Sequence, residues 1–309
     1  MRNYLVSLKN NTPWLLLIWH RLLLIKGRKQ SKKLSDLEAV NQLYFNYSGR
    51  YPNLEDPKTF SEKQQWMKLN YENPLMTICA DKFAVRDYLL KKGYKSILST
   101  VLGYYKSIEE IDLNALPTKF VLKASHGSGW NLIVHNKAEI AWRPWMQIMK
   151  CWLLNDIFWP GREWPYKYMP KGIICEAYME DASGELMDYK FHCFNGVPKY
   201  IQANKGRSLK LHAQNFYDLN WNILPFGKDL TPLPDVTIEK PHCLNEMIRI
   251  AKDLSQEFPF VRVDLYEVNK KVIFGELTFY PKSGLPDFVP AEYDAIIGEY
   301  LTLPINDGY

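Results

Sequence analysis

The clearest pattern in the chain is an alternation of polar and apolar residues in two short runs. Residues 261–266 read Val-Arg-Val-Asp-Leu-Tyr, and residues 274–278 read Phe-Gly-Glu-Leu-Thr, with a polar stretch between them. An alternation with a period of two predicts β-strands. The two runs are therefore expected to form a hairpin centred on Lys270.

This hairpin would bring charged side chains together. With Lys270 at its centre, Asp264 lies opposite Glu276, and Arg262 lies opposite Thr278. Side chains two apart on a strand share a face, and paired strands lie about 4.8 Å apart. The two carboxylates and the hydroxyl are oxygen ligands that suit Mg²⁺. A half-solvated edge hairpin with a cross-strand salt bridge explains the pattern equally well.

Apolar periodicity predicts the remaining elements. Helices are expected within residues 35–95, including a helix that begins near 56–63 and another over 74–92, and again over 138–157 and 241–257. Strands are expected over 119–124, 132–135, 172–178, 188–195 and 198–203. This order of helices, hairpins, helix and hairpin predicts an α+β fold.

A lysine inside an apolar strand precedes a loop that contains glycines. Lys123 belongs to the run Phe-Val-Leu-Lys-Ala, and Gly127 and Gly129 follow it. A lone lysine among apolar residues needs an anionic partner, and glycines let backbone N–H groups approach phosphate oxygens. The loop is neither a Walker A loop nor a protein-kinase loop. A hairpin with a surface lysine is the alternative.

Two further motifs are less specific. The strand that ends in Glu176 and Tyr178 fits an adenine-binding hinge, and Asp188 and Lys190 share a face of the next strand. A solvated hairpin explains this pattern as well. Upstream, Lys82 lies four residues before Arg86, which would place both on one face of a helix, where a solvated basic stripe is the alternative.

Composition indicates an ordered globular chain, with an uneven distribution of charge. Of 39 basic and 34 acidic residues, eight basic residues and no acidic residue lie within the first 35 positions, which leaves 31 basic and 34 acidic residues beyond them. The net charge of +5 therefore reflects the N-terminal segment. No nucleic-acid-binding face is indicated. The five cysteines form no CxxC motif, so neither a disulfide framework nor a zinc site is expected, and a reducing, cytoplasmic compartment is favoured.

The basic N-terminal segment also contains an apolar run over residues 14–25, which His20 and Arg21 interrupt. The run is too short to span a bilayer, and no small-residue cleavage site of a secretory signal follows it. Five basic residues follow directly: Lys26, Arg28, Lys29, Lys32 and Lys33. This combination fits a helix that lies in the interface of an anionic membrane. A helix docked on the protein's own core is the alternative.

Taken in order, these motifs resemble the ATP-grasp superfamily, and most nearly its bacterial TupA-like branch of teichuronopeptide and capsular polysaccharide biosynthesis. Further resemblance lies in residues 58–66, 188–191, 216–221 and 258–264, and it covers about residues 50–300. The resemblance implies an ATP-grasp fold, with two α+β lobes clasping ATP, preceded by an N-terminal helical region. The expected segments are a basic amphipathic segment over 1–35, a helical region over 36–117, a small lobe with the glycine loop over 118–180 and a large lobe with the metal site over 181–309.

The resemblance further implies roles in binding ATP. Lys82 and Lys123 would hold its phosphates, with Lys123 also near the adenine. Asp188 would bind the ribose. The phosphate lid would consist of His126, Gly127, Ser128 and Gly129, and the hinge of Glu176, Ala177 and Tyr178.

The remaining implied roles concern catalysis. Asp264 and Glu276 would hold Mg²⁺, and Arg262 would stabilise the acyl-phosphate transition state. Thr278 stands where many ATP-grasp enzymes have Asn, which leaves the third metal ligand open. The bulky Trp130 is unusual in such a lid, and a lysine common after the Phe-Tyr-Asp segment is not evident. Contacts to the γ-phosphate are therefore assigned to Lys190.

ATP-grasp chemistry activates a carboxylate as an acyl phosphate, which an amine attacks to form an amide. The chain is therefore expected to be an ATP- and Mg-dependent ligase that joins an amino acid or amine to a uronic-acid carboxyl of a surface polysaccharide, in the cytoplasm or on the inner face of the membrane. A glycosyltransferase is one rival, although the sequence has no Asp-x-Asp triplet. A non-catalytic ATP-binding protein is another, and the intact Lys123, Asp264 and Glu276 argue against it.

Overall fold

A computed structural model describes residues 12–30, 33–181, 186–205, 213–228 and 238–304. The chain divides into two compact units. The first comprises Met1–Ala39, Thr77–Arg86 and Ser99–Tyr178, and the second comprises Val40–Met76, Asp87–Leu98 and Met179–Tyr309. The four segments expected from the sequence stay a prediction.

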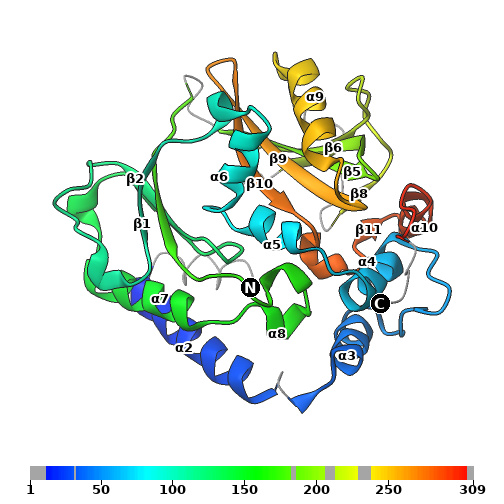
Figure 1. The fold of residues 1–309 in the computed structure, drawn as a ribbon, viewed down its shortest axis with the longest axis horizontal. Helices are drawn as coiled ribbons and strands as arrows, with labels where there is room; N and C mark the ends of the chain where they lie inside the picture. Colours follow the sequence, from blue (N-terminus) through cyan, green and yellow to red (C-terminus); the bar gives the residue numbers. More distant parts are fainter. Residues whose placement is uncertain (1–11, 31–32, 182–185, 206–212, 229–237, 305–309) are drawn as a thin grey trace. The chain divides into compact units, whose positions relative to one another are not determined.

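The structure has helices and antiparallel sheets, as the sequence predicted (Figure 1). The helices are α2 (Pro13–Gln30), α3 (Asp36–Ser48), α4 (Phe60–Asn70), α5 (Pro74–Ala80), α6 (Val85–Lys91), α7 (Trp142–Leu154), α8 (Phe158–Gly161), α9 (Leu244–Ser255) and α10 (Tyr293–Gly298). The strands are β1 (Val101–Tyr105), β2 (Phe120–Ala124), β3 (Asn131–Val134), β4 (Ile173–Ala177), β5 (Met187–Phe194), β6 (Val197–Lys205), β7 (Ala213–Tyr217), β8 (Gly227–Lys228), β9 (Phe260–Val268), β10 (Lys271–Thr278) and β11 (Phe288–Val289). Strands β1, β7, β8 and β11 were not expected from the sequence.

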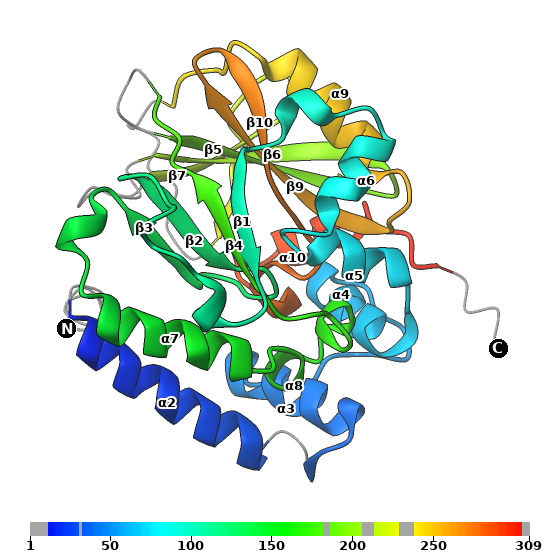
Figure 2. The ribbon, with the colours of Figure 1, turned by 60° about the vertical axis from the view of Figure 1, so that its left-hand side comes forward.

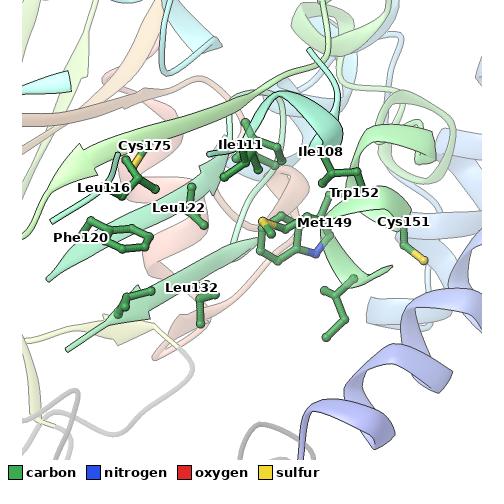
Figure 3. Close-up of a cluster of buried hydrophobic side chains, with 14 of the residues drawn as sticks. Ile108, Ile111, Leu116, Phe120, Leu122, Leu132, Met149, Cys151, Trp152 and Cys175 are labelled. Carbon is green, nitrogen blue, oxygen red and sulfur yellow. The ribbon is translucent and has the colours of Figure 1, made fainter. Parts of the chain in front are cut away.

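In the first unit, a four-stranded antiparallel sheet in the order β1-β4-β2-β3 packs against α7. Inward-facing Phe120 and Leu122 of the sheet meet Met149 and Trp152 of the helix in one buried cluster (Figure 3). The alternation of apolar residues along β2 places these side chains on the covered face. The opposite parity leaves Lys123 on the other face.

The N-terminal helix α2 lies alongside α7 (Figures 1 and 2). Its Leu17 belongs to the same buried cluster, and His20 is buried against Trp152. One face of α2 therefore docks on the protein's own core, as the alternative interpretation of the sequence held. Among the residues that the structure describes, no helix is both long and apolar enough to cross a membrane.

In the second unit, a five-stranded antiparallel sheet runs in the order β10-β9-β5-β6-β7, and α9 packs against β5, β6 and β9 (Figure 2). Met247 and Leu254 of α9 are fully buried, as are Val261 and Val263 of β9. Alternation then directs the polar residues of β5 and β9 to the opposite face of the sheet. That face carries the charged residues that the sequence singled out.

The hairpin β9–β10 has the predicted pairing at the four candidate site residues. Asp264 lies opposite Glu276, and Arg262 lies opposite Thr278. The turn itself differs, because its two residues are Asn269 and Lys270 rather than a single central residue, and a bulge at residue 275 restores the predicted pairing beyond it.

The helix expected over residues 74–92 is two helices, α5 and α6. The Asp81 carboxylate accepts hydrogen bonds from the backbone N–H groups of Phe83 (2.7 Å) and Ala84 (3.0 Å), which caps the start of α6. Lys82 therefore lies in a turn. The prediction that Lys82 and Arg86 share one face of a continuous helix is wrong.

The helix expected to begin near residues 56–63 is α4. Thr59 is its N-cap, and Glu62 completes a capping box. Glu62 also pairs with Arg50 at 2.7 Å. This motif of the sequence is therefore a structural feature of the second unit.

Candidate functional site

Within the first unit, Lys123 of strand β2 is paired with an anionic side chain. The Lys123 ammonium forms an ion pair with the Glu176 carboxylate, which also accepts a hydrogen bond from the Ser99 hydroxyl. Burial alone would raise the pKa of Glu176, but Lys123 and Ser99 outweigh it and the pKa is lowered. The predicted phosphate lysine and the predicted hinge acid thus form one charged pair, with 27% and 13% of their side chains exposed.

The glycine loop lies beside this pair and is closed by backbone hydrogen bonds. Ala124 N–H donates to the Trp130 carbonyl at 2.9 Å. The Lys82 ammonium donates to the Gly127 carbonyl, and its backbone N–H donates to the Ser125 carbonyl at 3.1 Å. The structure therefore brings Lys82 and the loop together although Lys82 is not helical.

The composition of the loop follows from its packing. A Cβ at Gly127 would lie 2.4 Å from the Trp130 ring, so the bulky Trp130 requires a glycine there. Gly129 has a positive φ of 69°, which also favours glycine. Ser128 and Gly129 form the exposed tip of the loop.

His126 anchors the loop to the core of the first unit. Its side chain is 2% exposed, and its Nε2–H donates to the Trp152 carbonyl at 2.9 Å. Burial lowers the pKa of His126 to about 4. Its imidazole is therefore neutral and directed into the core of the first unit.

We expect the free energy of unfolding to fall as the pH drops from about 6.5, the ordinary histidine pKa, towards about 4. In that window the unfolded chain binds a proton at His126 that the folded chain does not bind. The stability that neutral His126 gives the folded chain is therefore complete above the window and is lost as the pH falls through it. The slope is at most about 1.4 kcal/mol per pH unit. Urea unfolding of the parent chain and of His126→Gln across this range should show a weaker pH dependence in the variant, and equal slopes would contradict this origin.

The hinge residues follow Glu176 at the end of β4. The Ala177 N–H donates to the Thr100 carbonyl at 2.9 Å, so this donor is already used within the unit. The Tyr178 ring lies 5.0 Å from the His135 ring, and the Lys119 ammonium lies 5.8 Å from its centre. Adenine recognition by these residues stays a prediction.

Within the second unit, four charged side chains form one buried network on β5 and β9. Arg262 binds Asp264 through Nε at 2.7 Å and through Nη2 at 2.8 Å. The Lys190 ammonium bridges Asp264 and Asp188, the latter at 2.7 Å. Burial alone would lower the pKa of Arg262, but the charge of Asp264 outweighs it and the pKa is raised. Arg262 therefore stays charged, and the ion pairs of the network hold the Arg262 and Lys190 side chains in position.

The network continues onto β10. The Thr278 hydroxyl accepts a hydrogen bond from Arg262 at 3.1 Å and donates to Glu276 at 3.2 Å. The Glu276 side chain is 38% exposed, so it is the most accessible carboxylate of the network. The network thus contains one more carboxylate than cations: Asp188, Asp264 and Glu276 against Lys190 and Arg262.

The donor set fits Mg²⁺ in part. Asp264 and Glu276 supply the two carboxylates that Mg²⁺ commonly takes from a protein, the remaining ligands being waters and substrate phosphates. Among the described residues, no cluster of three or more His, Cys, Asp or Glu side chains is arranged to hold a metal. Because the Thr278 hydroxyl already donates to Glu276, it orients that carboxylate. A phosphate-bound Mg²⁺ is therefore compatible with these residues.

The sequence-based predictions did not include the ion pair between Lys228 and Asp287. Lys228 is 7% exposed, lies 4.2 Å from the centre of the Phe288 ring and pairs with Asp287 at 3.1 Å. Burial lowers the pKa of Lys228, and Asp287 acts against it. Burial, and after it the positive charge of Lys228, lowers the pKa of His192 on the charged sheet face. The charge of Arg262 on the same face further lowers the pKa of Lys228. Lys228 follows the Phe-Tyr-Asp segment, and its place after apolar Phe226 was the only local signal.

Comparison with known protein families gives one match, to a model described as TupA-like ATP-grasp, over residues 62–302. That range contains every residue of both charged sites. Comparison with curated proteins gives no match.

Several solved structures are similar. A D-alanine–D-alanine ligase from Helicobacter pylori is 13% identical, with 73% of this chain and 62% of that chain covered and a TM-score of 0.36. A D-alanine–D-alanine ligase from Bacillus anthracis, complexed with ATP, is 16% identical, with 71% and 61% covered and a TM-score of 0.40. A carboxyaminoimidazole ribonucleotide synthase from Aspergillus clavatus is 9% identical, with 65% and 45% covered and a TM-score of 0.35. The chain thus spans about three fifths or less of the length of these proteins.

Proposed function

We propose, since the chain belongs to the TupA-like ATP-grasp family, that it is an ATP- and Mg-dependent ligase that joins a carboxylate to an amine. The observation that carries the proposal is the network of Arg262, Asp264 and Lys190 with Glu276 and Thr278. Its two fixed cations and its excess of carboxylate suit a phosphoryl group that arrives with a metal ion. The charges are held in place before any substrate binds, as electrostatic catalysis requires.

In this proposal each residue has a defined task. Lys82 and Lys123 bind the phosphates of ATP, and the backbone of the loop from His126 to Gly129 covers them. Glu176, Ala177 and Tyr178 border the adenine, and Asp188 receives the ribose. Binding of a phosphate to Lys123 has to displace or share its contact with Glu176.

The second unit supplies the groups for phosphoryl transfer. In this proposal Arg262 and Lys190, both paired with Asp264, stabilise the negative charge that develops when the γ-phosphoryl group passes to a carboxylate oxygen. When bound, Mg²⁺ would neutralise charge on the transferring phosphate oxygens, and Asp264, Glu276 and Thr278 are the residues that would hold or orient it. An amine then attacks the carbonyl carbon of the acyl phosphate, inorganic phosphate leaves, the nitrogen loses a proton and an amide forms.

For the acceptor we propose a uronic-acid carboxyl of a cell-surface or capsular polysaccharide, as in the teichuronopeptide pathway that the TupA-like resemblance implies. A glycosyltransferase of such a pathway is a weaker alternative, because the sequence has no Asp-x-Asp triplet for the metal of a nucleotide-sugar site. A purely ATP-binding protein would not need Arg262 and Lys190 fixed between three carboxylates.

An ADP-release assay tests this function. The purified chain is incubated with Mg-ATP and with pairs of one carboxylate and one amine, in which uronic acids and short uronic-acid oligosaccharides are combined with amino acids. We expect ADP release that requires both partners. ADP release at the same rate without any carboxylate, or transfer of a sugar from a nucleotide sugar, would contradict the ligase.

We also propose that the chain works in the cytoplasm on the inner face of the membrane, held there by the outer face of α2. This face consists of Trp14, Leu15, Ile18, Trp19 and Leu22, which are between 41% and 58% exposed. A helix that is apolar all round is normally buried on every side, whereas α2 is covered by α7 on one side. Basic residues without any acidic residue surround this face in the sequence, which matches an anionic lipid surface.

We expect Ile18→Glu with Leu22→Glu to weaken binding to vesicles that contain phosphatidylglycerol at least about tenfold, because two apolar side chains no longer enter the lipid. Binding of the parent chain should also weaken with salt, since the charge attraction is screened. Sedimentation with vesicles measures both effects. Val197→Glu with Ile296→Glu, at positions 43% and 42% exposed, is the matched control.

No vesicle binding by the parent chain would overturn the membrane proposal. A concentration-dependent dimer that the α2 variant abolishes would do the same, because it would assign this face to a second copy of the chain. Deletion of α2 is a poor test, since it also removes buried Leu17.

A further inference from the structure

Three amides form a row on the charged face of the second unit's sheet, beside the network described above. We name Gln202 and Asn204 of β6 and Gln214 of β7 the amide row. Gln202 lies opposite Lys190, and Asn204 lies opposite both Asp188 on β5 and Gln214 on β7. Opposite residues of antiparallel strands share a face. The amide row therefore continues the charged face towards β7, and strands β5, β6 and β7 lie next to one another (Figure 2).

The hydrogen bonds within the row fix the orientation of each amide. His192 donates from Nε2 to the Gln202 carbonyl oxygen at 3.3 Å. The Gln202 and Gln214 NH₂ groups both donate to the Asn204 oxygen, at 3.5 Å and 3.1 Å. Because Asn204 Oδ1 accepts from two NH₂ groups, its own NH₂ group must point away from them. The chain of bonds thus runs in one direction from His192 to Asn204.

This arrangement leaves one donor and one acceptor without a partner. Among the described residues, neither Asn204 Nδ2 nor Gln214 Oε1 has a hydrogen-bond partner, although both atoms are buried. Asn204 as a whole is 3% exposed. Buried polar atoms nearly always have a hydrogen-bond partner. One donor and one acceptor without a partner, on the face of a proposed active site, therefore point to a ligand that supplies the missing bonds.

The chemistry of the two open atoms restricts the ligand. A carboxylate or a phosphate offers acceptors only, and the Gln214 carbonyl oxygen would repel it. An apolar group would satisfy neither atom. A hydroxyl both donates and accepts, and two neighbouring hydroxyls can bind the amide N–H and the amide carbonyl at once.

We propose that the amide row binds vicinal hydroxyl groups of a sugar ring, which rests on the ligase function proposed above. Two sugars are present in that reaction: the ribose of ATP and the glycan that carries the carboxylate. Asp188, which lies opposite Asn204, adds a further acceptor for a hydroxyl on either ring. The shared chemistry is a pair of adjacent hydroxyls, and the experiment separates the two sources.

The test measures binding by calorimetry for the parent chain, Gln214→Ala and Asn204→Ala. ATP is compared with 2′,3′-dideoxy-ATP, and glucuronate is compared with succinate, which has a carboxylate but no hydroxyl. We expect each variant to bind one hydroxyl-bearing ligand about fivefold more weakly or worse, and its hydroxyl-free counterpart as the parent chain does. Loss for ATP assigns the row to the ribose, and loss for glucuronate assigns it to the glycan.

Controls keep the result interpretable. Gln214 lies half-buried on β7, so Gln214→Ala is expected to fold even if Asn204→Ala does not. Gln42→Ala with Asn46→Ala, on the exposed side of α3, is the matched amide control. Unchanged affinities for both sugars in a folded Gln214→Ala variant would overturn the amide row while the ligase stands. A parent chain that binds neither ATP nor glucuronate would overturn both proposals.

Discussion

Replacing Glu276 by Gln is expected to lower ligation turnover by at least about 100-fold, with thermal unfolding close to that of the parent chain. Glu276 faces Asp264 across the hairpin and is 38% exposed, so an amide fits the same space. The change removes one negative charge from the proposed Mg²⁺ site. Loss of one preorganised electrostatic contact in an active site commonly costs about 10²–10³ in turnover.

The dependence on Mg²⁺ gives this prediction its specificity. The Glu276→Gln variant should need more Mg²⁺ for half-maximal activity, while ATP affinity changes little. Glu246→Gln, at an exposed position of α9, is the matched control and should behave as the parent chain does. Full activity of Glu276→Gln at low Mg²⁺ would remove Glu276 from the metal site.

Asp264→Asn is a less direct test of the metal, although its effect on turnover should be as large. Asp264 is 1% exposed and neutralises both Arg262 and Lys190. Breaking a buried ion pair on one side costs about 3–5 kcal/mol of stability. A loss of activity in this variant therefore has to be read together with its unfolding curve.

Replacing Lys123 by Met is expected to weaken Mg-ATP binding at least about tenfold, because a hydrogen bond to a charged group contributes about 1.5–3 kcal/mol. The variant also leaves the carboxylate of Glu176, with a side chain 13% exposed, without its cation. Some loss of stability is therefore expected beside the loss of affinity. Calorimetry of ATP binding and thermal unfolding measure the two effects separately.

The double variant Lys123→Met with Glu176→Gln separates these effects further. Removal of both charges should restore much of the stability, because no buried charge is left unpaired. ATP affinity should stay low, since the phosphate-binding cation is still missing. Recovery of ATP affinity in the double variant would show that Lys123 serves only to neutralise Glu176.

The hairpin β9–β10 shows what a local sequence pattern can predict and what it cannot. Alternation placed Arg262, Asp264, Glu276 and Thr278 on one face, and the structure pairs them as predicted. The bulge at Gly275 could not be predicted from the sequence, because it depends on how closely the backbones of β9 and β10 approach each other. A Cβ there would lie 2.9 Å from the Asp264 carbonyl oxygen, a contact between different strands.

Other differences have similar causes. The break between α5 and α6 did have a local signal, since Asp81 is a good N-cap residue, but the apolar periodicity on both sides concealed it. The pairing of Lys123 with Glu176 joins positions 53 residues apart in sequence, and that of Lys228 with Asp287 joins positions 59 apart. Such pairs follow from strand order, which no local pattern contains.

The most direct test of the proposed ligase follows oxygen from the carboxylate. Glucuronate labelled with ¹⁸O in its carboxyl group, or a labelled carboxylate found by the ADP-release screen, is incubated with the chain, Mg-ATP and an amine. An acyl phosphate loses one carboxyl oxygen to phosphate when the amide forms, so the released phosphate should carry one ¹⁸O atom for each ADP produced. Unlabelled phosphate, or label that appears in AMP, would contradict the account.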